Sequence, residues 1–439
     1  MTTRTLPFVF EGKAYDAGEW GYTHHPGGPL LLEHAAGTDA TAAIRANHPA
    51  AVIERLLPVF RVGTEKREGG ALPAPHWDGV YAELAGRVEA AGLLDPLASG
   101  PLAANAWALW RCGALWWLFR HFCCDGSALG AGLLLAAFWQ QAALLAHDAG
   151  HNALTHHRGL DRAAGTVLAS ALGGLSLGWW KDSHHVHHLV TNEPAHDPDI
   201  QHAPFLAVSG RLLDGTLTSS YYPGRVLVAG GAPGRLLLSV QHHTYYLLCA
   251  LGRLGLYTLS YGHLARCCLA LAGLSPASPP PSNFRPASAA DRTWLAAELA
   301  GIALFWWWYA SAALSLGPAF VAASHLGCIV LHLQITLSHF GMPTDAPPED
   351  SFLARGLRTT TDVEWPARLD WMYGGLQFQV AHHLFPRLPR SNLRAATALL
   401  VETLRKHGLE ASYSRLPLRK VLAQVTGVLR RVANQVGKK

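Results

Sequence analysis

The chain of 439 residues is half apolar, has 15 tryptophans and carries only 15% charged residues. Soluble globular proteins carry about 25% charged residues, so this composition indicates a membrane protein with polar parts. The net charge of +5 is modest, and no aromatic residues alternate with the basic ones, which argues against a nucleic-acid-binding protein. The 25 histidines lie in clusters, and clustered histidines indicate metal binding.

The first segment, residues 1–66, is polar and mixed, with strand-like runs at 8–10 and 59–62, and we expect a small soluble domain. His25 opens a His-Pro-Gly-Gly sequence, and His48 follows later in the same segment. Two such histidines can approach a flat ring from opposite faces, while the glycines let the backbone pass close to it. A haem held in this way has no open position for oxygen and transfers electrons. The alternative is that the glycines form only a tight turn and that His48 is a surface residue.

Four apolar segments after this domain are each close to the ~20 residues that cross a bilayer. They are residues 103–120, 127–147, 294–316 and 319–339. We expect them to form two transmembrane hairpins, although Arg111 within the first segment is costly in a bilayer. Before these segments, residues 67–100 are expected to form a linker and an amphipathic helix near 80–91.

Two further apolar segments, 163–180 and 245–274, are interrupted by glycines, Arg253 and His263. For both we favour helices that lie at the membrane interface, with one more hairpin as the alternative. Basic residues are concentrated in 411–439, which predicts a basic cytosolic tail by the positive-inside rule. An even number of spans then places both termini in the cytosol.

Three motifs rich in histidine adjoin the apolar segments, and helical geometry places the members of each motif on one face. They are His147 with His151, then His184 with His187 and His188, then Gln379 with His382 and His383. His185 is turned about 100° away from its neighbours. Seven histidines exceed the ligands of one tetrahedral zinc, so two metal ions are implied. Imidazole ligands with room for dioxygen suit iron, and a haem on the same chain indicates redox chemistry rather than hydrolysis.

The order HxxxH, HxxHH and QxxHH resembles the membrane fatty-acyl and sphingolipid desaturases, and residues 8–63, with their HPGG sequence, resemble cytochrome b5. Together they are similar to the front-end branch of the desaturases. The resemblance implies a multidomain fold: a small α+β haem domain in 1–66, then an all-α membrane desaturase domain in 101–410. That second domain would have four transmembrane helices and a cytosolic histidine-rich di-iron cap.

The same resemblance assigns the metal ligands. The iron ligands are His147, His151, His184, His187, His188, His382 and His383, with His339 at the end of the fourth span as a further ligand. His25 and His48 are the axial ligands of haem b, whereas His24 and His34 are expected to face solvent. The acyl-CoA relatives have an asparagine four residues before the histidine that corresponds to His339, where this chain has Ile335, so it is open whether any residue here supports that ligand as the asparagine would.

Other residues near the motifs are expected to play lesser parts. Gln379 would act outside the coordination sphere, or as a weak ligand, and help to orient the site. His332 is expected to be packed or to line a channel. We expect that four flanking histidines are not ligands: His156, His157, His196 and His202.

The segments beside the motifs, among them LQITLSHF, LRTTTDVEWP and GGLQFQ, resemble the Δ8 sphingolipid desaturases, the fungal group most of all. This implies a trans double bond at C8 of the long-chain base of ceramide or glucosylceramide, made at the endoplasmic reticulum membrane. Dioxygen would be the oxidant, and an NADH-dependent cytochrome b5 reductase would supply electrons through the fused haem. The main alternative is an acyl front-end desaturase (Δ5, Δ6 or Δ8) that acts on acyl-CoA or phospholipid chains. A hydroxylase on the same scaffold and a non-enzymatic haem-binding membrane adaptor are further alternatives.

Overall fold

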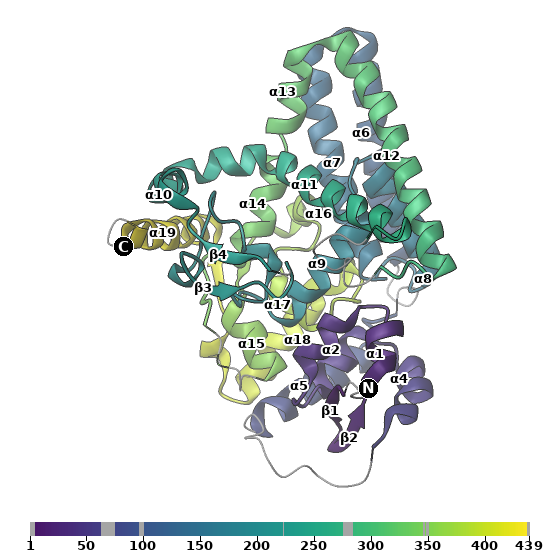
Figure 1. Cartoon of the computed structure of the whole chain (residues 1–439), viewed down its shortest axis with the longest axis vertical. Coiled ribbons are helices and arrows are strands. Elements are labelled where there is room, and N and C mark those ends of the chain that lie inside the picture. The colour runs from purple at the N-terminus through teal and green to yellow at the C-terminus, as the bar shows by residue number, and fades with distance from the viewer. Residues whose placement is uncertain are drawn as a thin grey trace.

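The computed structural model describes residues 5–62, 75–95, 101–222, 224–274, 284–345, 347 and 351–436. A small N-terminal domain lies against one end of a larger helical domain (Figure 1). Two long helical hairpins project from the opposite end of the larger domain. The histidine motifs therefore lie in the layer between the N-terminal domain and the hairpins.

The N-terminal domain combines a two-stranded antiparallel sheet with short helices. Its elements are β1 (Pro7–Phe10), β2 (Lys13–Asp16), α1 (Gly18–His24), α2 (Pro29–Ala35), α3 (Thr41–Asn47) and α4 (Ala50–Leu56). Phe8, Phe10 and Tyr15 are buried in its core, because alternate strand residues point to one face. The strand predicted at 8–10 is confirmed. The strand predicted at 59–62 is wrong, since a helical turn occupies Leu57–Phe60 and only Arg61 bridges to β2.

The helix predicted near residues 80–91 is confirmed as α5 (Pro75–Ala90). Its buried residues Val80, Leu84 and Val88 recur at a helical spacing and share a core with α18 (Leu393–Lys406). The predicted linker falls largely on residues 63–74 and 96–100, which lie outside the described residues.

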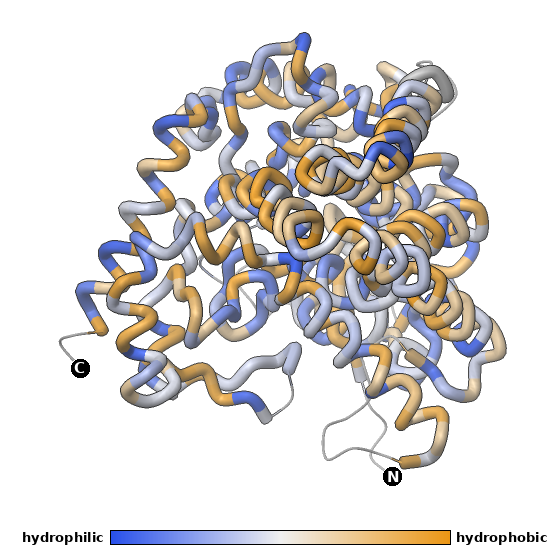
Figure 2. Tube along the Cα trace, turned by 90° about the horizontal axis from the view of Figure 1, so that it is seen from above, coloured by the Kyte–Doolittle hydropathy of each residue, from blue (hydrophilic) through white to orange (hydrophobic). Residues whose placement is uncertain are grey.

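Two hairpins contain the apolar segments. They are formed by α6 (Pro101–Cys124) with α7 (Ala128–Gly150), and by α12 (Ala289–Leu316) with α13 (Pro318–Leu326) and α14 (Ile329–Leu337). Within the described residues, three stretches are long and apolar enough to cross a membrane: 128–150, 289–316 and 318–337. Helix α6 packs along α7 but is not among the three, so a fourth span stays a prediction. Figure 2, seen from above, shows apolar turns along the helices nearest the viewer.

The remaining elements surround the histidine motifs. They are α8 (Arg158–Thr166), α9 (Leu177–Leu189), α10 (Gly231–Ser239), α11 (Gln241–Leu271), α15 (Phe352–Thr359), α16 (Asp370–Tyr373), α17 (Gln379–Leu384), α19 (Leu418–Val436), β3 (Asp214–Thr218), β4 (Val226–Val228), β5 (Asp362–Glu364) and β6 (Arg415–Pro417). The segment 245–274 is part of one continuous helix, α11, which runs across the hairpins rather than along them (Figure 1). The segment 163–180 is divided between α8, a π-helical turn and α9.

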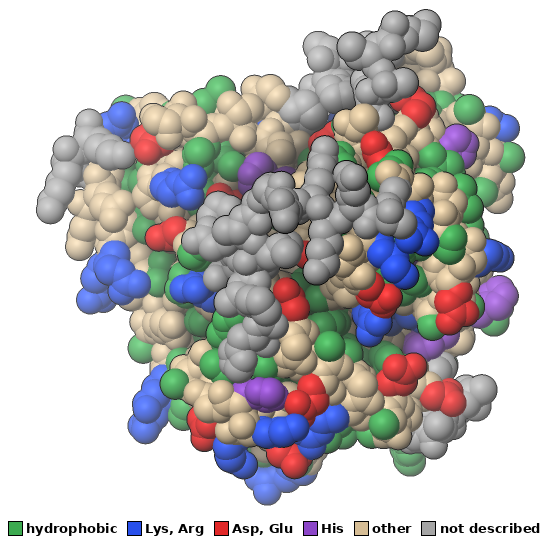
Figure 3. Space-filling model, turned by 90° about the horizontal axis from the view of Figure 1, so that it is seen from below, with side chains coloured by type: hydrophobic (Ala, Val, Ile, Leu, Met, Phe, Trp, Pro, Cys, Tyr) green, Lys and Arg blue, Asp and Glu red, His purple; other side chains and the backbone are tan. Residues whose placement is uncertain are grey.

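The C-terminal segment expected to be a basic tail packs against the larger domain. Strand β6 pairs in parallel with β5, and α19 buries Val421, Val425 and Val432 in the core. These apolar residues lie on one face of α19, whereas Arg430 and Arg431 are exposed. The segment is therefore a structural part of the domain. Figure 3 shows the molecule from below, where acidic and basic side chains are intermixed on the surface.

Candidate metal centre and haem site

Four chain segments bring the predicted histidines together. His147 lies in the last turn of α7 and His151 follows that helix. Helix α9 carries the second motif, and α17 carries the third. His339 comes two residues after α14 ends. The spacings of three and four residues keep each set on one side of its helix, as predicted.

The first group is made of His147, His151, His184 and His382. One ring nitrogen from each of these residues lies within 4.8 Å of the corresponding nitrogens of the others. The rings of His147 and His382 are 4.6 Å apart, although the two residues come from α7 and α17. Four imidazoles at this separation match the ligand shell of one metal ion.

The second group is made of His187, His339 and His383, whose ring nitrogens also lie within 4.8 Å of one another. His188 lies between the two groups, with its ring 4.6 Å from that of His151 and 4.1 Å from that of His383. The second motif is therefore divided between two adjacent groups. This arrangement suits two metal ions side by side.

The chemistry of the donor atoms fits a metal. The Nε2 atoms of His151, His382 and His383 are buried and have no hydrogen-bond partner among the described residues. The pKa of all three rings lies well below the usual value for histidine. Burial is the main cause and the nearby histidines are the second, so each ring is neutral. A buried polar atom without a partner is costly, and a metal ion satisfies a neutral imidazole nitrogen.

Aspartates orient several of these rings. The Nδ1 atom of His187 lies 2.9 Å from Asp197, that of His184 lies 3.6 Å from Asp199, and that of His147 lies 3.2 Å from Asp148. A carboxylate that accepts the Nδ1 proton leaves Nε2 free to bind a metal. Burial by itself would lower the pKa of His187, but Asp197 and Asp199 outweigh it and raise that pKa to about 9.

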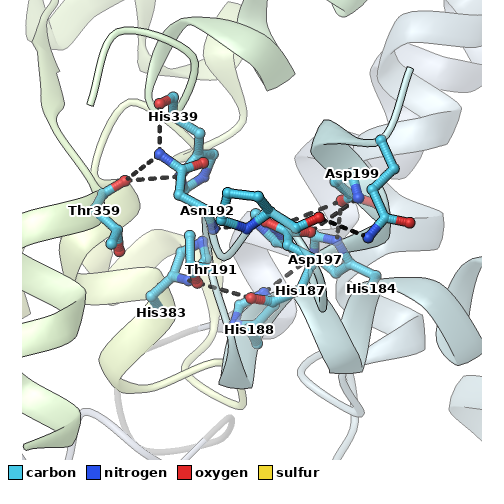
Figure 4. A network of polar contacts seen from close by, with 12 residues as sticks. His184, His187, His188, Thr191, Asn192, Asp197, Asp199, His339, Thr359 and His383 are labelled. Carbon is cyan, nitrogen blue, oxygen red and sulfur yellow. Dashed lines mark hydrogen bonds and ion pairs between the residues drawn. The ribbon is translucent and has the colours of Figure 1, made fainter. Parts of the chain in front are cut away.

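Asp197 is itself fixed by the backbone (Figure 4). Its side chain is fully buried and accepts hydrogen bonds from the backbone N–H groups of Asn192 at 2.7 Å and Asp199 at 2.9 Å. The Asn192 amide donates to the carbonyl of His339 at 2.8 Å, so one loop supports two residues of the second group. Sequence reasoning missed this role of Asp197, Asp199 and Asn192. The signal was a pair of aspartates shortly after the second motif.

Gln379 begins α17, one turn before His382 and His383. Its side chain is buried, and its Oε1 atom has no hydrogen-bond partner among the described residues. The structure therefore places an unpaired acceptor beside the third motif. A role outside the coordination sphere stays a prediction.

The expectations for the other histidines are confirmed in some cases and wrong in one. His332 is packed as expected, and its ring donates to the carbonyl of Cys328 at 2.9 Å. His24 is exposed as expected. The expectation for His34 is wrong, because its ring lies 4.6 Å from that of His196 across the two domains. The four flanking histidines lie outside both groups: His156, His157, His196 and His202.

An apolar cavity of about 130 Å³ adjoins the first group. His147 and Trp180 form part of its wall, and Leu331 belongs to its apolar lining. Arg253 also lines the cavity, and its guanidinium lies 3.6 Å from the ring centre of Trp139. The cavity can therefore hold a hydrocarbon segment beside the histidines.

The N-terminal histidines also form a site. The rings of His25 and His48 are 6.0 Å apart between centroids. If both rings bound one iron from opposite sides, two metal–nitrogen bonds of ~2.0 Å, each with ~1 Å more to the ring centre, would separate the ring centroids by ~6 Å. The Nδ1 atoms of these rings face the carbonyls of Gly28 at 3.3 Å and Ile44 at 3.0 Å, which leaves both Nε2 atoms free. Burial lowers the pKa of His25 to about 4 and also lowers that of His48, so both rings suit a haem iron.

The N-terminal domain docks on the helix that carries the second motif. Leu30 of α2 packs with Val186 and Val190 in one buried cluster. Val186 lies on the side of α9 opposite to His184, and Val190 follows the last residue of the helix. Helix α9 therefore carries part of the candidate metal centre and also contacts α2 of the domain that contains the candidate haem site (Figure 1).

Comparisons with known proteins agree with this geometry. The family model described as fatty acid desaturase matches residues 126–415. The chain belongs to the fatty acid desaturase family. Its N-terminal part matches the cytochrome b5-like haem/steroid binding domain over residues 4–66. The desaturase thus carries a haem-binding domain ahead of its family domain.

Several desaturases of known name are similar to this chain. A Delta 8-(E)-sphingolipid desaturase of Komagataella phaffii is 43% identical over 293 residues, which cover 65% of this chain and 50% of that protein. One of the same name from Emericella nidulans is 39% identical over 368 residues, covering 81% of this chain and 62% of that protein. The Delta(8)-fatty-acid desaturase 2 of Arabidopsis thaliana is 30% identical over 421 residues, which cover 91% of this chain and 84% of that protein. The chain thus spans about half the length of the first of these relatives.

Proposed function

We propose that this protein is a Δ8 sphingolipid desaturase. It inserts a trans double bond at C8 of the long-chain base of ceramide or glucosylceramide, with O2 as oxidant and electrons delivered through its own haem domain. The observation that carries the proposal is the meeting of two histidine groups beside an apolar cavity. The substrate assignment rests on the identity to the fungal relatives named as Delta 8-(E)-sphingolipid desaturases.

The two histidine groups would hold two iron ions. The first group is His147, His151, His184 and His382, the second is His187, His339 and His383, and His188 lies between them. An iron pair supplies O2 activation for the removal of hydrogen from two neighbouring methylene groups. The neutral, buried ring nitrogens and the aspartates behind them support this assignment.

The residues around the cavity would position the lipid. The cavity adjoins the first group at His147, so a methylene chain within it would pass the metal centre. Trp180 stacks on His184 with ring centroids 4.4 Å apart and closes one side of the group. The lining of the cavity is mostly apolar, which favours a hydrocarbon chain over water, and its polar residues include Ser176 and Arg253 besides His147.

The N-terminal domain would bind haem b through His25 and His48 and pass electrons to the iron pair. An NADH-dependent cytochrome b5 reductase is the proposed source of these electrons. Docking of α2 on α9 supports transfer within one chain.

The proposed location is the endoplasmic reticulum membrane, with both termini and the metal centre in the cytosol. Three apolar helices and the common direction of the two hairpins support a membrane position (Figure 1). The N-terminal domain lies at the opposite end, where it would remain in water.

Expression in a yeast host without Δ8 desaturation tests the proposal. Mass spectrometry of long-chain bases should detect a new trans double bond at C8. A variant with His187→Ala and His188→Ala should make none. The matched control is His243→Ala, because the His243 ring packs on His242 outside both groups. New double bonds in fatty acids alone would contradict the sphingolipid assignment.

An acyl front-end desaturase is the second candidate. It is favoured by the similarity to the plant Delta(8)-fatty-acid desaturases, whose alignments extend over more than four fifths of each chain. The same mass spectrometry separates the two, because one reaction changes bases and the other changes acyl chains. A hydroxylated base without a double bond would instead indicate a hydroxylase.

A further inference from the structure

The short helix α17 supplies one candidate ligand to each histidine group. His382 belongs to the first group and His383 to the second, so a movement of this helix would change both groups. Like any helix, α17 leaves its first backbone N–H groups without a partner inside the helix. The residue at the usual capping position is Phe378, whose side chain has no acceptor. An acceptor for these groups must therefore come from another part of the chain.

Asp362 of strand β5 is that acceptor. Its Oδ1 atom accepts a hydrogen bond from the backbone N–H of Val380 at 2.9 Å, although the two residues are 18 positions apart in the chain. The side chain of Asp362 is fully buried. A negative charge at the N-terminus of a helix is favourable, because the helix dipole is positive there. The bond thus fixes the start of α17 just before His382.

The C-terminal segment in turn holds Asp362. The hydroxyl of Tyr413 donates to Oδ2 of Asp362 at 2.6 Å, so each carboxylate oxygen has its own donor. The backbone N–H of Asp362 donates to the carbonyl of Ser414 at 2.9 Å, next to the pairing of β5 with β6. Burial raises the pKa of Asp362 to about 6, and the bonds from Tyr413 and Val380 oppose this rise. The carboxylate is therefore mainly ionised at neutral pH and accepts from both donors.

The residues before Asp362 also contact the segment that carries His339. The backbone N–H of Thr361 donates to the carbonyl of Ser338 at 2.9 Å, and Ser338 directly precedes His339. The carbonyl of Thr359 lies 3.4 Å from Nδ1 of His339 (Figure 4). One short segment therefore contacts both the end of α14 and the start of α17.

We propose that Asp362 is a positioning residue of the candidate metal centre: its carboxylate, held by Tyr413, keeps α17 in the orientation that directs one histidine into each group. The inference rests on the metal centre of the proposed function. Asp362 acts through the backbone of α17 and not as a ligand, because both of its oxygens already accept hydrogen bonds. Its loss therefore weakens the binding of both irons together.

Iron release from the full-length protein during timed exposure to a chelator tests the proposal. Asp362→Leu removes both acceptor oxygens at a similar volume. It should lower the affinity for both irons by at least about tenfold, because the loss of a supporting partner in metal sites has an effect of ~10- to 100-fold. Asp362→Asn is the conservative variant. Its amide oxygen still accepts from Val380, so it should retain most of the affinity.

Gln241→Leu is the matched control. Gln241 is equally buried, and its side-chain oxygen accepts from the backbone N–H of Ala207 at 2.8 Å, away from α17. This variant should release iron at the wild-type rate. Tyr413→Phe is the second test variant, because it removes only one oxygen and keeps the carboxylate in place. It should release both irons several-fold faster than the wild-type protein, also if Asp362→Leu does not fold.

Cobalt binding separates positioning from general stability. Co²⁺ takes imidazole ligands, and its visible absorption depends on the geometry of those ligands. The spectra are recorded at a temperature where circular dichroism shows each variant to be folded. Asp362→Leu and Tyr413→Phe should shift the cobalt bands, whereas Gln241→Leu should leave them unchanged.

Unchanged iron release and cobalt bands in Asp362→Leu and Tyr413→Phe would overturn the proposal. A loss confined to one iron would also overturn it, since α17 carries a candidate ligand of each group. Equal acceleration by Asp362→Leu and Gln241→Leu would assign the effect to folding and likewise overturn it. A wild-type protein that bound no metal would instead refute the metal centre of the proposed function, and this inference with it. A different lipid product would leave the result intact, because the readouts are metal release and cobalt absorption.

Discussion

Replacing Asp197 with asparagine is expected to weaken the second iron site and spare the first. The Asp197 carboxylate is fully buried and accepts three hydrogen bonds, from His187 at 2.9 Å, Asn192 at 2.7 Å and Asp199 at 2.9 Å. Asparagine has one acceptor oxygen and an amide that cannot accept, so at least one of these donors loses its partner.

The magnitude follows from the bond to His187. A hydrogen bond to a buried charged group contributes ~1.5–3 kcal/mol, which corresponds to ~10- to 100-fold in metal affinity. Loss of such a supporting partner in metal sites has an effect of ~10- to 100-fold. The group of His187, His339 and His383 should therefore release its iron first, while the group around His151 keeps its own.

The order of iron release is measured by iron analysis of the purified protein during timed exposure to a chelator. Asp197→Asn should lose one of its two irons early, with product formation falling in parallel. Glu298→Gln is the matched control, because Glu298 is equally buried and accepts from a backbone N–H group but contacts none of the histidine groups. Equal retention of both irons by wild-type protein and Asp197→Asn would refute the reasoning.

Three further predictions concern single histidines and the glutamine. His339→Ala should lower the iron content and abolish product formation. The control His332→Ala, which removes a packed ring of the same segment, should retain iron. Retention of iron by His339→Ala would exclude His339 as a ligand. Gln379→His should reduce product formation because a strong ligand replaces a weak one, and full activity in the lipid assay would show that the position only fills space. Burial, followed by His196, lowers the pKa of His34 to about 4, so domain docking should be stable above pH 6.5 and weaken as the pH falls towards 4. Hydrogen exchange in α2 measures the docking, and His34→Phe should flatten its pH dependence. An unchanged pH dependence in that variant would contradict the role of His34.

The spacing of residues within one helix was enough to predict which histidines share a face. The pairing of rings from different helices was not, because it depends on contacts between residues far apart in the chain, such as His147 with His382. For the same reason the sequence predicted three histidines of α9 as one set, whereas the structure divides them between two groups. His34 was misjudged because its exposure depends on the position of the second domain.

The residues that hold the histidines in place also could not be predicted from the spacing of residues along one helix. Asp197 follows the second motif closely, but its role depends on a loop in which Asn192 adopts a positive φ of 62°. That conformation turns the Asn192 backbone N–H towards Asp197 and its side chain towards the carbonyl of His339. No periodic pattern predicts such a turn.

Helix α9 lies between the candidate metal centre and the haem domain, and its sides contact different partners. The candidate iron ligands His184 and His187 lie on one side of the helix, whereas Val186 on the opposite side and Val190 just after the helix pack against Leu30 of the haem domain. A helix packed in this way has little freedom to rotate, since rotation would separate Val186 from Leu30 and displace the candidate metal ligands. We therefore expect docking of the haem domain also to restrain the geometry of the proposed metal centre. A chain that lost this docking would be affected in both electron delivery and iron retention.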